Sequence, residues 1–188
     1  MDRRYFLKSS GIALAGIGIA AYFWLRNPDY LAGELLNEYD AGRRGEDAVA
    51  IADEILNSEE PDLYRYPMTR WLYGAYEPLD NALGVLISVG FVAIRRVPRS
   101  ADGNEVARHD YYLLEAGHSA IESIISEYPE LQWYRTRAAI VADLAGDTPG
   151  PRLKDRQHAQ ATYHDTSLGI NIGPIEEAVR QRLAELRL

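Results

Sequence analysis

Cysteine is absent from this chain of 188 residues. Its absence excludes disulfide bonds, thiolate catalysis, iron–sulfur ligation by cysteine and covalent haem attachment through C-x-x-C-H. It also excludes a lipoprotein anchor, which requires a cysteine to acylate. The phosphate-binding patterns G-x-x-x-x-G-K and G-x-G-x-x-G are missing, as is the G-x-S-x-G turn of many serine hydrolases. The sequence therefore leans away from an enzyme: we expect no catalytic residue and predict no cofactor.

Basic residues are outnumbered by acidic ones, 20 against 28, which gives a formal net charge of −8. An acidic chain repels phosphate backbones, so we expect no nucleic-acid partner. Hydrophobic residues make up 47 % of the chain and charged residues 26 %, the ordinary composition of a globular protein. At this length we expect one domain with a core of its own.

The N-terminus reads Arg3-Arg4-Tyr5-Phe6-Leu7-Lys8, and the residues from Ser9 to Leu25 carry no charge. This opening resembles the twin-arginine (Tat) export signal, whose pattern is R-R-x-F-L-K, at every specified position: Arg3, Arg4, Phe6, Leu7 and Lys8. The resemblance implies export of the folded chain by the Tat translocase. The body would then lie on the periplasmic side of the inner (cytoplasmic) membrane, with the basic residues on the cytoplasmic side.

Two fates of the signal segment remain open. Small residues in Gly18-Ile19-Ala20 would permit cleavage after Ala20. Ser9–Leu25 as a retained helix would be about 26 Å long, which spans a bilayer if the bilayer thins locally. Aromatic residues beside a cation end this stretch in the manner of a membrane–water boundary: Tyr22, Phe23, Trp24 and Arg26. We predict a retained anchor over 1–26 and an extracytoplasmic domain over 27–188.

Most apolar residues of the body recur at spacings of three and four, which predicts an all-α bundle or irregular array of about six to seven helices. The final helix is predicted over Pro174–Leu186, because Ile175, Val179 and Leu183 fall on one face. We predict an aromatic helix over Asp62–Tyr76. Leu83–Ile94 is too short to cross a bilayer, and we predict it to be a buried central helix or a helix–strand element.

A small β-hairpin near residues 91–112 is the alternative to helix in the middle of the chain. Phe91–Val97 could pair with Glu105–Tyr112 across a polar loop that contains Asp102-Gly103. In the helical alternative, Asp110 caps a long helix that runs to Tyr128. Its inner face would then hold Leu114, Ile121, Ile124, Ile125 and Tyr128.

Aromatic residues concentrate in the segment Leu63–Tyr76. Tyrosine and tryptophan are enriched at protein interfaces, where they supply large contact areas. The same rings could instead close the core of a small bundle. The sequence thus offers a candidate partner surface formed by Tyr64, Tyr66, Trp71, Tyr73 and Tyr76.

Two carboxylate–histidine pairs have the i, i+3 spacing that places both side chains on one helix face. They are Glu115 with His118 and Asp155 with His158, and Glu122 lies one turn beyond His118. Ferritin-like bundles bind metal with Glu-x-x-His on two helices and further glutamates on others. The alternative is that these side chains are solvated or cap helices, as such residues commonly do.

Together these features predict a membrane-tethered, periplasm-side helical accessory or scaffold protein that binds a partner protein or complex. One alternative is a small non-catalytic subunit of a Tat-exported periplasmic oxidoreductase, whose layout would resemble the short helical subunits of sugar or gluconate dehydrogenases. A second alternative is a metal-binding helical bundle that uses the carboxylate and histidine pairs.

Overall fold

The computed structural model describes residues 23–60, 69–71, 74–76, 80–97, 108–146, 148 and 150–187, and these are mostly helical, as predicted. The twin-arginine motif at Arg3, Arg4, Phe6, Leu7 and Lys8 lies outside the described residues. Within the part of the chain that is described, no helix is both long enough and apolar enough to span a membrane.

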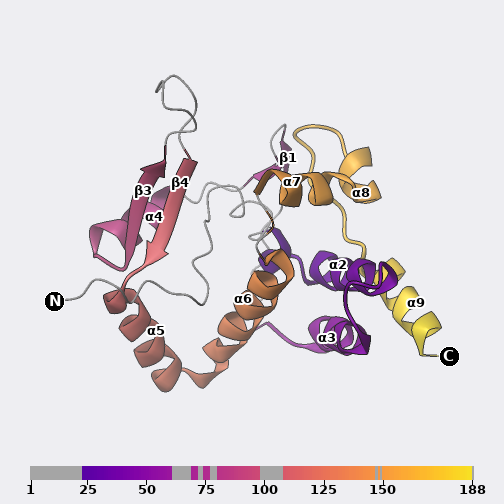
Figure 1. Ribbon diagram of the computed structural model, residues 1–188, viewed down its shortest axis with the longest axis horizontal. Coiled ribbons are helices and arrows are strands. Elements are labelled where there is room, and N and C mark those ends of the chain that lie inside the picture. Colours follow the sequence, from indigo (N-terminus) through magenta and orange to yellow (C-terminus); the bar gives the residue numbers. More distant parts are fainter. Residues whose placement is uncertain are drawn as a thin grey trace.

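A group of helices, which we call the body, forms the larger part of the described chain (Figure 1). Helices α2, α3 and α9 all contact one another. The body consists of α2 (Pro28–Asp40), α3 (Glu46–Asn57), α6 (Gln132–Ala145), α7 (Gly150–His158), α8 (Ala161–Asp165) and α9 (Glu176–Leu186). The predicted last helix is confirmed, and its Val179 and Leu183 are buried.

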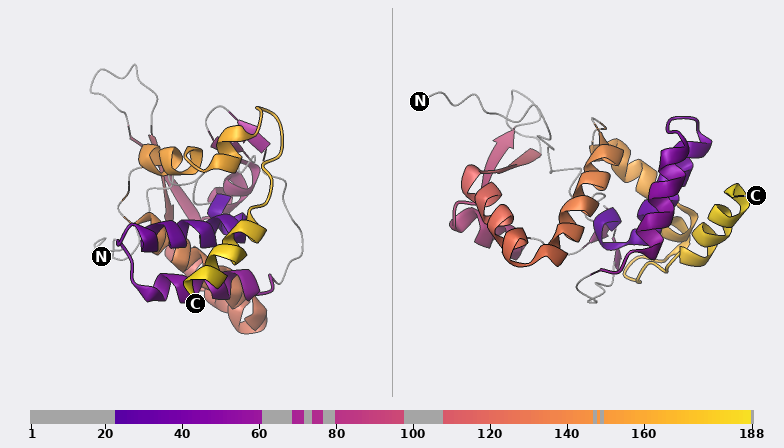
Figure 2. Two further views of the ribbon diagram at one scale, coloured as in Figure 1. Left: turned by 90° about the vertical axis from the view of Figure 1, so that its right-hand side faces the viewer. Right: turned by 90° about the horizontal axis from the view of Figure 1, so that it is seen from below.

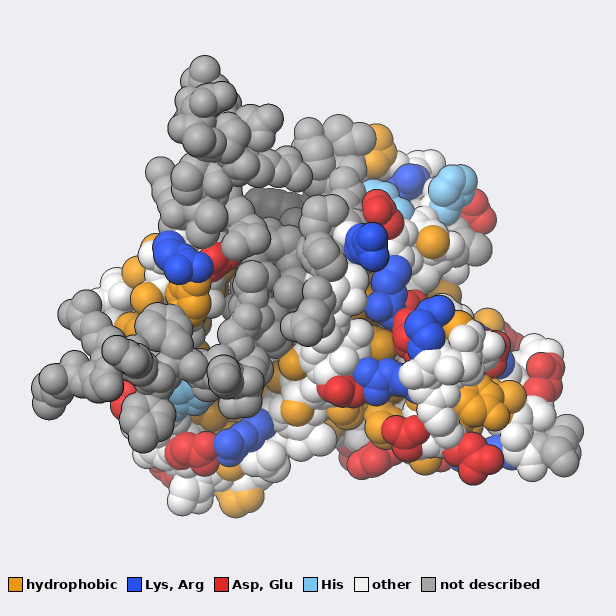
Figure 3. Space-filling view, viewed as in Figure 1, with side chains coloured by type: hydrophobic (Ala, Val, Ile, Leu, Met, Phe, Trp, Pro, Cys, Tyr) orange, Lys and Arg blue, Asp and Glu red, His pale blue; other side chains and the backbone are white. Residues whose placement is uncertain are grey.

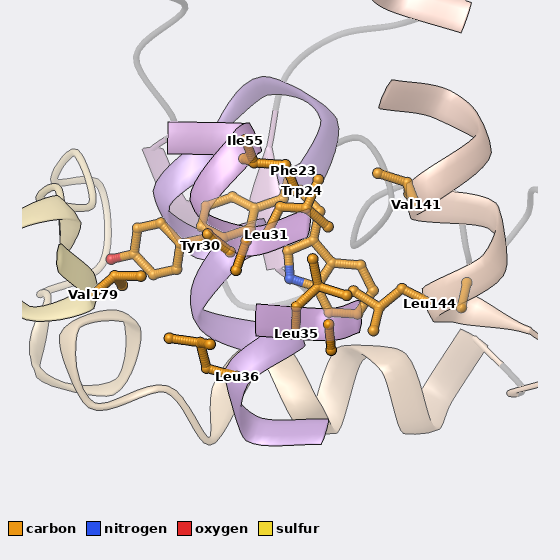
Figure 4. Packing of buried hydrophobic residues seen from close by; sticks show 14 of the residues in the cluster. Phe23, Trp24, Tyr30, Leu31, Leu35, Leu36, Ile55, Val141, Leu144 and Val179 are labelled. Carbon is orange, nitrogen blue, oxygen red and sulfur yellow. The ribbon is translucent and has the colours of Figure 1, made fainter. Parts of the chain in front are cut away.

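The core of the body forms around α2 and the helical residues 23–26 that precede it (Figure 4). Trp24 lies between α2 and the side chains that α6 contributes, Val141 and Leu144. Helix α3 adds Ile55 and helix α9 adds Val179. Segments from both ends of the described chain therefore share one hydrophobic core.

A second group of elements, which we call the arm, projects from the body on the far side of α6 (Figure 2). It consists of α4 (Asp80–Ser88), β3 (Val92–Val97), β4 (Arg108–Leu113) and α5 (Glu115–Glu127). A short 3₁₀ helix, η1 (Pro129–Leu131), joins α5 to α6, so the two helices diverge from a tight corner.

Strands β3 and β4 pair antiparallel, with Val92 opposite Leu113 and Val97 opposite Arg108. This pairing confirms the hairpin alternative near 91–112. The predicted capping role of Asp110 is wrong: Asp110 lies within β4, is 2 % exposed, and accepts a hydrogen bond from Arg95 at 3.0 Å. Arg95 of the opposite strand binds Asp110 within the hairpin. Asp110 does not cap α5, which begins five residues later at Glu115.

The predicted aromatic helix over Asp62–Tyr76 is also wrong in its described part. Thr69–Trp71 (β1) and Gly74–Tyr76 (β2) form an antiparallel pair. This pair continues onto the segment before α9, because the amide of Arg70 donates to the carbonyl of Ile170 at 2.9 Å. A third segment, distant in sequence, therefore favours the extended backbone here.

Candidate partner-binding surface

Helix α5 carries a line of apolar side chains that the rest of the described chain leaves uncovered. Leu114, just before the helix, is 38 % exposed. Ile121, Ile124 and Tyr128 are 38 %, 47 % and 49 % exposed. We call these four residues the α5 stripe. They were predicted to face inward, and the structure corrects that prediction.

Helix α4 also exposes apolar side chains. Val85 and Val89 are 61 % and 54 % exposed, and Leu86 is exposed too. The prediction of a buried helix over Leu83–Ile94 is therefore wrong, although its helix–strand alternative is confirmed. In Figure 3, hydrophobic side chains reach the surface over the arm, on the left of the view.

Gly117 explains how the arm is assembled. It is one of two buried residues among those described between Asp80 and Leu131, the other being Asp110. A Cβ atom at this position would lie 2.6 Å from the carbonyl oxygen of Phe91 and 2.7 Å from Cδ1 of Leu113. The missing side chain thus lets the start of α5 lie directly against the hairpin.

The stripe continues beyond this junction on the same helix face. Ile121 and Ile124 follow Gly117 by four and seven positions, which places all three on one side of the helix. The hairpin covers Gly117, whereas Ile121 and Ile124 remain exposed. The hairpin therefore covers only the first part of the apolar face of α5, and the rest of that face is exposed.

Acidic side chains surround the far end of the stripe. The segment from Glu115 to Leu131 contains four glutamates and neither lysine nor arginine: Glu115, Glu122, Glu127 and Glu130. Glu122 pairs with Arg135 of α6 at 2.7 Å, and both side chains are exposed. Among the described residues the other three glutamates form no ion pair.

Two buried carboxylates of the body, by contrast, are paired with arginines. Arg156 of α7 donates to Glu34 and Glu38 of α2, each at 2.7 Å, and Arg43 also donates to Glu38. The hydrogen bond from Arg43, assisted by the nearby guanidinium of Arg156, lowers the pKa of the Glu38 carboxyl. Because both carboxylates are nearly buried, this network is a structural element and not an open site.

Arg137 of α6 is 3 % exposed and ties α6 to the end of α3. It donates to the hydroxyl of Ser58 at 3.0 Å, beside the carbonyl of Ile55, and its guanidinium lies 4.3 Å from the ring of Trp133. A cation at a helix C-terminus is favoured by the helix dipole. Burial lowers the pKa of Arg137 to about 10, opposed by the negative charge of Glu60.

The residues predicted to mark a membrane boundary have another place in the structure. Phe23 and Trp24 are fully buried in the core of the body, and Arg26 forms a 2.6 Å ion pair with Glu60. Aromatic rings beside a cation suit the edge of a protein core as well as a bilayer interface. Tyr22 lies outside the described residues.

The predicted tyrosine surface falls largely outside what the structure describes. Tyr64, Tyr66 and Tyr73 lie outside the described residues. The backbones of Trp71 and Tyr76 belong to β1 and β2, and their side chains are not described. This surface remains a prediction.

The proposed metal ligands are not brought together. Glu115, His118 and Glu122 lie on α5, whereas Asp155 and His158 lie on α7, across α6 from the arm (Figures 1 and 2). His158 stacks on Tyr163 with ring centroids 4.7 Å apart. Among the described residues, no three histidine or carboxylate side chains gather in a metal-binding arrangement.

The sequence did reveal the stripe as a periodic apolar face, but periodicity gave no sign that the face would be exposed. Glu127 and Glu130 were not predicted to belong to a site, although the run from Glu115 to Leu131 holds four glutamates and no lysine or arginine, which indicates an acidic surface. Comparisons of this chain with protein-family models, with curated proteins and with solved structures find no match.

Proposed function

We propose that this chain is an exported accessory protein that binds a partner protein at the extracytoplasmic face of the membrane, to which its N-terminal segment tethers it. The observation that carries the proposal is the exposed stripe on α5. Contiguous exposed apolar surface on a soluble domain commonly marks an interaction site. The resemblance of the first eight residues to a twin-arginine signal supports the location.

The lack of an enclosed reactive group among the described residues favours a binding role over catalysis. The histidine–carboxylate contact between His164 and Asp165 has both side chains more than three-quarters exposed. Three charged side chains are the most strongly buried of those described, and each has a partner from another segment: Glu34, Asp110 and Arg137. The arm exposes apolar surface that a partner can contact, and the body contains the hydrophobic core.

The binding test is affinity purification of the full chain from gently solubilised membranes. The wild-type chain should recover a stoichiometric partner protein, and Ile121→Glu/Ile124→Glu should lose it. Ser119→Glu/Ser126→Glu is the matched control, because it adds the same charge to exposed positions off the stripe. Recovery of the chain alone at native abundance would contradict the proposal.

Export is tested separately by changing Arg3 and Arg4 to lysine, which should abolish translocation by the twin-arginine route. The tether has its own constraint. Because Phe23 and Trp24 belong to the core, only Ser9–Tyr22 remains uncharged and free to enter a bilayer. As a helix it would be about 21 Å long, against a hydrocarbon core of ~30 Å, so retention requires local thinning.

The intact mass of the chain recovered from membranes distinguishes the two fates of the signal. A mass that includes residues 1–20 supports the tether. Cleavage after Ala20 would leave both core rings in the exported chain and would contradict the tether while keeping the accessory role.

A further inference from the structure

We infer that the element that covers the α5 stripe is a helix of a partner protein with an apolar seam and basic flanks. This inference rests on the proposed use of the stripe as a binding surface, and it specifies the chemistry of the partner. It follows from the spacing of the exposed residues, from the shape of the surface and from the charge around it.

The spacing along α5 is that of a coiled-coil seam. Leu114, Gly117, Ile121, Ile124 and Tyr128 follow one another at intervals of three, four, three and four residues. In heptad terms they occupy alternating a and d positions, the positions that interdigitate with a neighbouring helix. A partner helix with the same spacing would place its side chains between those of α5.

The free part of the seam defines where the partner lies. The hairpin occupies Gly117, so the partner contacts mainly Ile121, Ile124 and Tyr128. Helices α5 and α6 diverge from η1, so α6 does not cover this face (Figure 2). The contact spans about two helical turns, from Ile121 to Tyr128.

The charge indicates which helix fits. Glu127 occupies the g position beside the seam, and Glu130 follows just beyond Tyr128. Neither glutamate has an ion-pair partner among the described residues. Lysine or arginine at the e and g positions of a partner helix would therefore pair with this end of α5, and a partner with acidic flanks would be repelled.

Two other occupants fit less well. A second copy of the chain would bring together two segments that each carry four glutamates and no lysine or arginine, on chains with a net charge of −8. A bilayer surface with anionic lipids would repel the same glutamates, whereas helices that lie on membranes usually carry basic residues beside the apolar face.

The test uses the full-length chain in a non-ionic detergent and three fluorescein-labelled synthetic peptides of three heptads. The first peptide has leucine at a and d and lysine at e and g, and the second has glutamate at e and g instead. The third contains the residues of the first in a scrambled order. Fluorescence anisotropy measures the affinity of each peptide.

The basic heptad peptide should bind about tenfold more tightly than the acidic and scrambled peptides. Ile121→Glu/Ile124→Glu should reduce this binding to the level of the scrambled peptide, and Ser119→Glu/Ser126→Glu should leave it unchanged. Glu127→Gln/Glu130→Gln should narrow the preference for the basic over the acidic peptide at least threefold, with circular dichroism confirming that the helices persist.

Several results would overturn the inference. Equal binding of the basic and acidic peptides would show that the glutamates do not select the partner. Equal binding of the basic and scrambled peptides would show that heptad spacing does not matter. Sedimentation that shows a dimer, lost in Ile121→Glu/Ile124→Glu, would assign the stripe to a second copy. Vesicle binding lost in the same variant would assign it to the bilayer. The proposed function is tested by a different experiment, the recovery of a partner protein by affinity purification from membranes.

Discussion

Helices α2 and α5 are both 13 residues long and both carry leucine or isoleucine at helical spacing. Nine residues of α2 are buried, whereas Gly117 is the one buried residue of α5. Their carboxylates differ in the same way: Glu34 and Glu38 of α2 are held by arginines from other helices, and Glu127 of α5 has no ion-pair partner among the described residues.

The difference shows that the body covers its apolar side chains and the arm leaves its own exposed. In the body, apolar side chains from α2, α3, α6 and α9 meet in one core. In the arm, no hydrophobic side chain among those described between residues 80 and 131 is buried. Since burial of apolar area drives folding, a partner that covers these side chains would stabilise the arm.

The sharpest test of this contrast is a matched pair of truncations. Leu35→Ala in α2 should lower the free energy of unfolding by about 3 kcal/mol, because it leaves a cavity around a side chain that is 1 % exposed. Ile124→Ala in α5 should change it by less than about 0.5 kcal/mol, as expected of an exposed site. Urea unfolding followed by circular dichroism measures both. Similar losses would mean that the stripe is covered within the chain.

The second test compares ion pairs. Arg156→Met should destabilise the body by roughly 3 kcal/mol, because Glu34 would remain nearly buried without a cation and Glu38 would keep only Arg43. Arg135→Met removes the partner of Glu122 at an exposed pair and should cost less than about 1 kcal/mol. Urea unfolding again provides the measurement. A cost for Arg135→Met as large as that for Arg156→Met would refute the distinction between the two regions.

The third test concerns the junction of α5 with the hairpin. Gly117→Ala should destabilise the arm by about 1–3 kcal/mol, because the carbonyl of Phe91 cannot move away from the new methyl group. Hydrogen exchange should quicken in β4 and α5 and remain unchanged in α2. Gly33→Ala is the control: its methyl would meet two side-chain atoms at 3.3 Å that can shift, and the gain in helix propensity offsets that cost. Unchanged exchange in Gly117→Ala would disprove the tight junction.

The smallest expected effect is a pH dependence confined to the body. Tyr30 donates to the carbonyl of Gly173 at 2.7 Å, and burial raises its pKa from the ordinary 10 to about 12. The folded state thus retains the phenol proton more strongly than the unfolded state does. This stabilisation is complete below pH 10 and is lost as the pH rises towards 12.

Tyr30→Phe should therefore be less stable than the wild type by about 1 kcal/mol below pH 10, through the lost hydrogen bond. The difference should shrink as the pH rises above 10 and reverse before pH 12, because the pKa rise stabilises the protonated wild type by more than this hydrogen bond alone. Unfolding free energies of both proteins across this range provide the measurement, and other groups that titrate there affect both alike. A constant difference would mean that Tyr30 does not titrate as its burial implies.

Local spacing was sufficient to predict where several helices lie. The three-and-four pattern of Ile175, Val179 and Leu183 predicted α9 because the same face both forms the helix and enters the core. Sequence alone could not identify what an apolar face contacts. The pattern from Leu114 to Tyr128 is as regular as that of α9, yet it is exposed, because covering it depends on distant parts of the chain.

The wrong predictions share a cause in contacts between residues far apart in sequence. The segment predicted as an aromatic helix contains β1, which takes its extended form beside Ile170. Asp110 has the residue type of a helix cap, but Arg95 across the hairpin determines its place. Secondary-structure propensity depends on the residue alone, whereas the conformation of β1 and of Asp110 depends on the segment that each of them pairs with.

The link between α2 and α9 has a consequence for the order of events in the cell. The carboxylate of Asp29 accepts a hydrogen bond at 2.7 Å from the amide of Ile175, 146 residues later, and the core joins Leu31 to Leu183. The body therefore cannot close until the ribosome has released its last helix. Helices α2 and α3 therefore remain incompletely packed while the residues between them and α9 are translated.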